Sequence, residues 1–228
     1  QAGQEVLPPD PALGHAADVV RMLGGAGGAE ALDTYLVTVC DHGLNASTFA
    51  ARVVASTQAG LASSVLAGLG ALKGPLHGGA PGPVIAMFDE IAAEGDARAW
   101  LERAVDDGER LMGFGHRIYR TRDPRADALK AAVARLPRSA GRLAFAEQVE
   151  QTALAVLAAH KPGRVLQTNV EFYTALLLEA VGFPAEAFTA VFAMGRVAGW
   201  LAHSREQALT GRLIRPQSVY LPPEAAAA

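Results

Sequence analysis

The chain has 228 residues, of which 50% are hydrophobic and 19% are charged, and its formal net charge is −3 at pH 7. This composition excludes a disordered protein, because so apolar a chain can bury enough surface to offset its conformational entropy. Nucleic acids and anionic membrane surfaces are not expected partners, since the chain has no block of like charges. A membrane-spanning helix is not expected either, because no apolar run reaches roughly 18–20 residues. The single cysteine, Cys40, excludes an internal disulfide and a cysteine-rich metal site, and fits a reducing compartment such as the cytoplasm. The first ten residues are polar and carry prolines, which is not typical of a secretory signal.

Alanine, the strongest helix former, makes up roughly a fifth of the chain, and the spacing of apolar residues predicts an all-α fold. Neither strand alternation nor an internal repeat is present. Capping residues and breakers mark several helix ends, such as the N-cap Asp96, the pair Asp123-Pro124 and the breaker Gly182. The expected helices cover residues 46–72 (as one helix or two), 96–110, 123–136, 144–160, 170–181 and 185–209.

Glycine and proline gather in two places, residues 74–83 and 182–184. The stretch between them is more charged, whereas both flanks are richer in alanine and glycine. We interpret this as a smaller helical domain inserted into a larger one, with hinges near the two clusters. The predicted boundaries are 1–77 for the first part of the large domain, 78–182 for the small domain and 183–228 for the rest of the large domain.

Three of the six histidines lie in unusual surroundings. His77 lies in GPLHGGAPGP, a segment whose glycines permit close approach of a ligand to the backbone, although an exposed loop after a helix is an equal alternative. His116 lies in LMGFGHRIYRTRDPR, where glycines and four arginines suit phosphate or carboxylate binding, the alternative being a solvated basic helix start. His42 precedes the helix start at Asn45, for which a capping region is the simpler interpretation. None of these histidines has metal-ligand spacing, so no metal site is predicted.

Three further residues are candidates for chemistry or for binding a charged group. Glu171 stands at the start of a strongly apolar helix, where burial would raise its pKa and suit a general base; the alternative is a partner of the helix dipole. Arg196 lies in a helix too apolar to face water, so it needs an anionic partner. A third, Arg215, lies in a terminal non-helical segment that could reach a neighbouring subunit.

Together these segments resemble the citrate synthase family over nearly the whole chain. The resemblance is carried by His42 with Asn45–Thr48, Gly74–Gly79, Gly113–Arg125, Asn169–Tyr173, Gly195-Arg196 with Gly199-Trp200, and Arg215-Pro216 with Tyr220. It implies an all-α fold in which a small domain closes over the substrates, with the large domain only partly present, since the match covers the C-terminal two-thirds of the usual chain. It also implies an acyltransferase of the tricarboxylic acid cycle that condenses acetyl-CoA with oxaloacetate. The reaction would pass through an enol or enolate and end with hydrolysis of citryl-CoA. The resemblance further implies that the enzyme is a homodimer and needs no metal or redox cofactor.

The resemblance implies a role for each matching residue. Glu171 stands at the position of the family's base, His77 at that of the donor to the thioester carbonyl, and His116 at that of the group that polarises the oxaloacetate ketone. The remaining roles are oxaloacetate binding by His42, Arg125 and Arg196, with Arg215 from the second subunit, and CoA binding by Leu111, Met112, Gly113, Phe114, Gly115 and Arg120.

The chain departs from the family in two ways: the base is usually aspartate, and the N-terminal part of the large domain has no counterpart here. Two alternatives therefore stay open beside citrate synthase. One is a 2-methylcitrate synthase, because one extra methylene on the acyl group changes binding by only about 1–3 kcal/mol. The other is a non-catalytic homologue that binds CoA or a dicarboxylate.

Overall fold

The computed structural model describes residues 7–25, 27–74, 77–78, 81–115, 121–137 and 139–221. Within these ranges all regular elements are helices, apart from one isolated β-bridge between Phe114 and Thr168. This confirms the all-α prediction. The elements are α1 (His15–Met22), α2 (Ala29–Val39), α3 (Ala46–Ser56), α4 (Leu61–Leu72), α5 (Pro81–Glu94), α6 (Ala97–Asp106), α7 (Pro124–Ala134), α8 (Ala140–His160), α9 (Val170–Val181), the 3₁₀ helix η1 (Ala185–Ala187) and α10 (Phe188–Thr210).

Some of the predicted helix bounds need correction. Residues 46–72 form two helices, because Gln58 and Gly60 take φ angles of 63° and 88° between them. The helix after Asp96 ends at Asp106 rather than at Arg110, since a turn with Gly108 at φ 80° follows. The predicted helix over 144–160 begins at residue 140, and the last region divides into η1 and α10. The helices α1, α2 and α5 have no counterpart among the expected helices.

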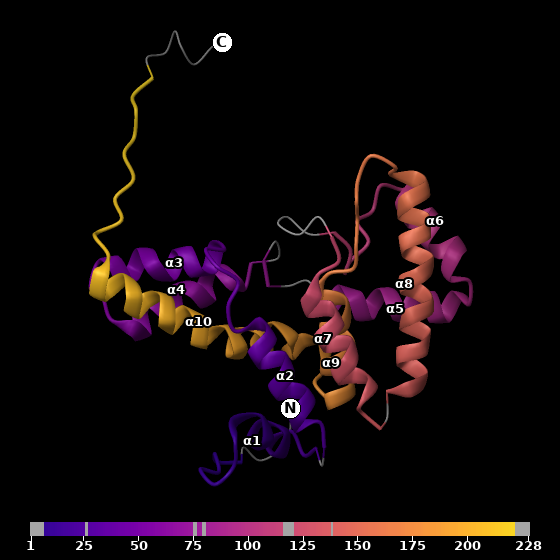
Figure 1. The fold of residues 1–228 in the computed structure, drawn as a ribbon, viewed down its shortest axis with the longest axis horizontal. Helices are drawn as coiled ribbons and strands as arrows, with labels where there is room; N and C mark the ends of the chain where they lie inside the picture. The colour runs from indigo at the N-terminus through magenta and orange to yellow at the C-terminus, as the bar shows by residue number, and fades with distance from the viewer. Residues whose placement is uncertain are drawn as a thin grey trace.

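The helices form two groups joined by a central layer (Figure 1). α3, α4 and α10 pack together at one end, α6 packs on α8 at the other, and α2, α7 and α9 contact one another between them. No single helix among the described residues is long and apolar enough to cross a membrane. The domain boundaries drawn from the sequence stay predictions.

The centre of this arrangement is α9, which is buried almost all round. Every residue from Phe172 to Leu178 is buried, and the Phe172 ring contacts the rings of Phe88, Phe114 and Tyr173 edge to face, with centroids 5.0–5.3 Å apart. Such aromatic contacts add to the stabilisation from burial. The start of α9, which carries Glu171, is therefore fixed by a rigid core.

Candidate active site

Five ionisable residues singled out from the sequence line one cavity of about 440 Å³. They come from five places in the chain: the α2–α3 loop, the turn after α4, and helices α7, α9 and α10. Only the fold brings them together, since more than 150 residues separate the first from the last. They are His42, His77, Arg125, Glu171 and Arg196.

Glu171 is the second residue of α9, and its backbone is tied to the glycine segment. The Asn169 side chain caps the helix: its Oδ1 accepts from the Glu171 N–H (2.9 Å), and its Nδ2 donates to the Gly115 carbonyl (2.8 Å). The Gly115 N–H donates to the Gln167 carbonyl at 2.7 Å. Burial raises the pKa of Glu171, partly opposed by the positive charge of Arg110 nearby. The carboxylate is thus positioned in the cavity and more basic than an exposed one, as a general base requires.

The His77 ring is hydrogen-bonded to the buried hydroxyl of Ser47. Its Nε2 lies 2.9 Å from Oγ of Ser47, which also receives the indole N–H of Trp200 (3.2 Å) and donates to Oδ1 of Asn45 (2.7 Å). Burial, and then the charge of Arg196, lower the pKa of His77 below its usual value. The lowered pKa favours a neutral imidazole at pH 7. While the Ser47 hydroxyl donates to Asn45, the one ring proton of His77 lies on Nε2 and is donated to Ser47. His77 can donate from Nδ1 to a substrate oxygen when the Ser47 hydroxyl turns its proton toward Nε2.

Arg125 is oriented by Asp123, the N-cap of α7. The Asp123 carboxylate accepts from Nε (3.0 Å) and Nη2 (2.8 Å) of Arg125, and it also accepts from the backbone N–H of Val170 at 3.1 Å. Although burial opposes ionisation of Asp123, these hydrogen bonds and the charge of Arg125 hold its pKa below the ordinary value. One buried carboxylate therefore fixes both the arginine and the start of α9.

Arg196 is almost completely buried, with 2% of its surface exposed. Its Nε donates to the Val39 carbonyl (2.7 Å), and its guanidinium lies over the Phe192 ring, 4.9 Å from the centroid. No carboxylate among the described residues forms an ion pair with Arg196, and burial lowers its pKa. Because a buried unpaired charge is costly, Arg196 favours an anion in the cavity.

The other predicted residues have different outcomes. His116 and Arg120 lie outside the described residues. Leu111, Phe114 and Gly115 line an adjacent hollow of about 410 Å³, and Gly115 also lines the 440 Å³ cavity, whereas Met112 and Gly113 line neither. Arg215 is exposed on the extended segment after α10, which leads away from the helices (Figure 1).

The cavity also has lining residues that sequence reasoning missed. Tyr35 and Val39 come from α2, whose existence was not predicted, and Thr174 and Phe192 look like ordinary core residues in sequence. Arg110 lines both the cavity and the adjacent hollow. Its place directly before the 111–115 segment is a signal that could have identified it.

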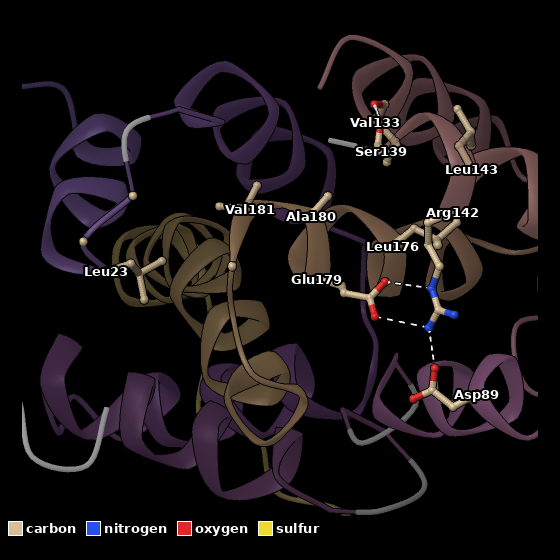
Figure 2. Close-up of a pocket in the computed structure, with 13 residues that line it drawn as sticks. Leu23, Asp89, Val133, Ser139, Arg142, Leu143, Leu176, Glu179, Ala180 and Val181 are labelled. Atoms are coloured by element: carbon tan, nitrogen blue, oxygen red, sulfur yellow. Dashed lines mark hydrogen bonds and ion pairs between the residues drawn. The ribbon is translucent and has the colours of Figure 1, made fainter. Parts of the chain in front are cut away.

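A larger cavity, of about 720 Å³, is not a candidate for the chemistry (Figure 2). Its main polar feature is Arg142, which binds both carboxylate oxygens of Glu179 (3.1 and 3.2 Å) and one of Asp89 (2.6 Å). The two carboxylates outweigh the single positive charge of Arg142, and no histidine among the described residues lines this cavity. Among the described residues, no group of three or more His, Cys, Asp or Glu could hold a metal ion.

Comparison with known proteins agrees with this geometry. A family model described as "Citrate synthase, C-terminal domain" matches residues 1–217. The chain belongs to the citrate synthase family. It is 50% identical over 194 residues to a Mycobacterium tuberculosis protein named "Putative citrate synthase 2", covering 85% of this chain and 52% of that protein.

Solved structures of the citrate synthase family share the fold. The Thermoplasma acidophilum citrate synthase, solved with carboxymethyl coenzyme A and oxaloacetate, matches with a TM-score of 0.82 and 34% identity, over 94% of this chain and 58% of that one. The citryl-CoA lyase of Hydrogenobacter thermophilus matches with a TM-score of 0.76 and 26% identity, over 94% of this chain and 89% of that one. The chain thus spans little more than half the length of the citrate synthases it matches.

Proposed function

We propose that the protein containing this chain is a citrate synthase, which joins the methyl carbon of acetyl-CoA to the ketone carbon of oxaloacetate. The observation that carries the proposal is the convergence of a basic carboxylate, Glu171, with a neutral histidine, His77, and the two arginines Arg125 and Arg196 around one cavity. This set supplies what the reaction needs: a base, a donor for the enolate oxygen and cations for a dicarboxylate.

In the first step, Glu171 takes a proton from the methyl group of acetyl-CoA while His77 donates a hydrogen bond to the thioester oxygen. The resulting enol or enolate carbon attacks the oxaloacetate ketone, whose oxygen becomes the citrate hydroxyl and takes up a proton. His116 is the predicted donor to that oxygen. Water then hydrolyses the citryl-CoA thioester, which releases citrate and CoA. No redox cofactor enters these steps, and the absence of a metal requirement stays a prediction.

The proposed active protein is a homodimer in which Arg215 reaches the cavity of the second copy. Two features support this arrangement. After Ile214, whose N–H donates to Oγ of Ser56 at 3.0 Å, the C-terminal segment runs away from the helices of its own chain (Figure 1), and Arg215 on this segment is exposed. In addition, α3 and α4 expose large apolar side chains, which favour contact with another surface. These are Phe49, Leu61, Leu66 and Leu69, each between 40% and 66% exposed. The CoA roles of residues 111–115 and Arg120, and the cytoplasmic location, stay predictions.

A steady-state assay of thiol release tests the proposal, with oxaloacetate and either acetyl-CoA or propionyl-CoA. For a citrate synthase we expect kcat/KM to be about 10- to 200-fold higher with acetyl-CoA, the discrimination that one methylene provides. The reverse preference indicates a 2-methylcitrate synthase. Formation of citryl-CoA without thiol release indicates an enzyme that does not hydrolyse the thioester, an outcome worth testing because one structural relative is named a citryl-CoA lyase. Substrate binding without any reaction indicates a non-catalytic homologue.

A further inference from the structure

A hydrogen-bonded chain joins α10 to the loop that carries His42. Nε2 of His203 lies 3.0 Å from Oδ1 of Asp41, and the other carboxylate oxygen of Asp41 accepts from the Gly43 N–H at 3.2 Å. Asp41 is therefore bonded to α10 and also binds the residue that follows His42, whose ring lines the cavity. Neither His203 nor Asp41 is among the residues that the resemblance assigns to a substrate.

The orientation of the His203 ring follows from its other neighbour. Nη1 of Arg52, on α3, lies 3.0 Å from Nδ1 of His203. A guanidinium can only donate hydrogen bonds, so Nδ1 accepts and the ring proton resides on Nε2, facing Asp41. Arg52 is itself held by Glu206 and by Oε1 of Gln207, which lies 3.2 Å from its Nε. The imidazole is thus fixed on both sides, with its donor directed at the loop.

Other contacts place the same face of α10 against this loop. Arg196, Gly199 and His203 are spaced by three and four residues and so share one face of the helix. They meet three consecutive residues at the end of α2 and the start of the loop that follows. Arg196 binds the Val39 carbonyl at 2.7 Å, a Cβ on Gly199 would lie 2.1 Å from the carbonyl oxygen of Cys40, and His203 binds Asp41. Of the three, only His203 forms a hydrogen bond with Asp41, the immediate neighbour of His42.

We propose that His203 is a positioning residue, which acts through Asp41 to hold the loop that presents His42 to the bound dicarboxylate. The inference rests on the proposed function for the identity of that ligand, oxaloacetate. A loop without this anchor samples other conformations, so only a fraction of molecules has His42 in place and the apparent affinity for the ligand falls by that fraction. The expected signature is weaker oxaloacetate binding rather than slower proton abstraction.

Two substitutions of similar polarity separate this role from packing. The amide of His203→Gln reaches about as far as Nε2, so it keeps a donor toward Asp41, whereas the amide of His203→Asn reaches only about as far as Nδ1. We expect His203→Asn to raise the Kd for oxaloacetate on the order of tenfold, which is the usual effect of losing a hydrogen bond to a charged group. His203→Gln should raise this Kd by less than about threefold. Calorimetry measures both values. KM for acetyl-CoA should stay within about twofold in both. The control is His160→Asn on α8, since the His160 ring binds the carbonyl of Val156 in its own helix.

NMR of the histidine rings supplies a readout that needs no ligand. We expect the wild-type protein to show His203 with its proton on Nε2, and the His42 ring signals to shift or broaden in His203→Asn but not in His203→Gln. Equal oxaloacetate affinity in the wild type and in His203→Asn overturns the proposal, and so do unchanged His42 signals. A wild-type protein that does not bind oxaloacetate refutes the proposed function instead, and the NMR comparison alone then decides the positioning role.

Discussion

Replacing Glu171 by glutamine removes the proposed base while leaving the site almost unchanged in shape. The amide has nearly the volume of the carboxylate, and the backbone of residue 171 stays bonded to the Asn169 side chain at 2.9 Å. Oxaloacetate should therefore bind as before, because its proposed ligands, Arg125 and Arg196, are untouched. What is lost is basicity, since an amide does not take up a proton at neutral pH.

The expected loss of turnover follows from the environment of the carboxylate. General-base catalysis contributes about 10²- to 10⁴-fold, which corresponds to roughly 3–5 kcal/mol of activation free energy. Burial raises the pKa of Glu171 above the ordinary glutamate value, so the wild-type group is a stronger base than an exposed carboxylate. We therefore expect kcat to fall at least about a hundredfold. In the wild type, kcat/KM should rise with pH through this raised pKa, because only the deprotonated carboxylate can accept the methyl proton.

Two assays check this prediction: thiol release, and exchange of the acetyl-CoA methyl protons with deuterated water by NMR. Glu171→Gln should lose both activities, and unaltered proton exchange would show that another residue is the base. Glu171→Asp is the sharper comparison, because it restores the residue usual in the family but withdraws the carboxylate by one methylene. We expect a cavity fitted to glutamate to lose activity, since about 1 Å of misplacement can cost a hundredfold. A faster aspartate enzyme would contradict this fit.

Three further predictions concern binding and stability. Arg196→Leu should raise the Kd for oxaloacetate at least about tenfold while CoA binding changes little, as calorimetry would show, because a charge-assisted contact is lost but no buried charge is left behind. Asp123→Asn should lower the free energy of unfolding at pH 7 by about 3 kcal/mol. Because the folded-state pKa of Asp123 is below the unfolded value of about 3.9, this difference should be full above pH 5 and disappear in urea titrations as the pH falls through the folded-state pKa. Gly199→Ala should destabilise the protein by about 1–3 kcal/mol in the same assay, since its Cβ would meet the Cys40 carbonyl at 2.1 Å. Its control, Gly70→Ala in α4, has no atom within 4 Å of the added Cβ and should be neutral or stabilising by up to about 1 kcal/mol.

The helices predicted well are those whose ends are encoded locally. The bounds of α9 match the prediction at both ends, because Asn169 caps its start with a side-chain hydrogen bond and Gly182 ends it at φ 105°. The start of α8 was placed four residues late, and its N-cap, Ser139, makes no side-chain capping bond. α2 was missed for a similar reason: its N-cap is Gly28, which has no side chain to signal a helix start.

The candidate site, like the fold, has parts that the sequence predicts and parts that it does not. Glycine-flanked histidines and a buried arginine are visible in sequence, because each contradicts the composition of its surroundings. The parts that could not be predicted are contacts between distant segments that have no local signature. Asp123 bonds both to Arg125 and to the backbone of Val170, and Tyr35 of α2 is buried in the cavity wall with 1% exposure. The sequence does not indicate which residues of two distant segments come into contact.

The connection between the glycine segment and the start of α9 links the predicted CoA contact to the chemistry. Phe114 pairs with Thr168 in the β-bridge, the Asn169 N–H binds the Gly113 carbonyl at 2.9 Å, and a Cβ on Gly113 would lie 2.9 Å from that of Phe172. Residues 113–115 and 167–172 are therefore held together by hydrogen bonds and close packing. If the first segment receives the adenine end of CoA, then binding energy from a remote part of the substrate also fixes the carboxylate of Glu171. Under the proposed function, the base is then held most firmly when the thioester is present, so that CoA recognition contributes to kcat as well as to affinity.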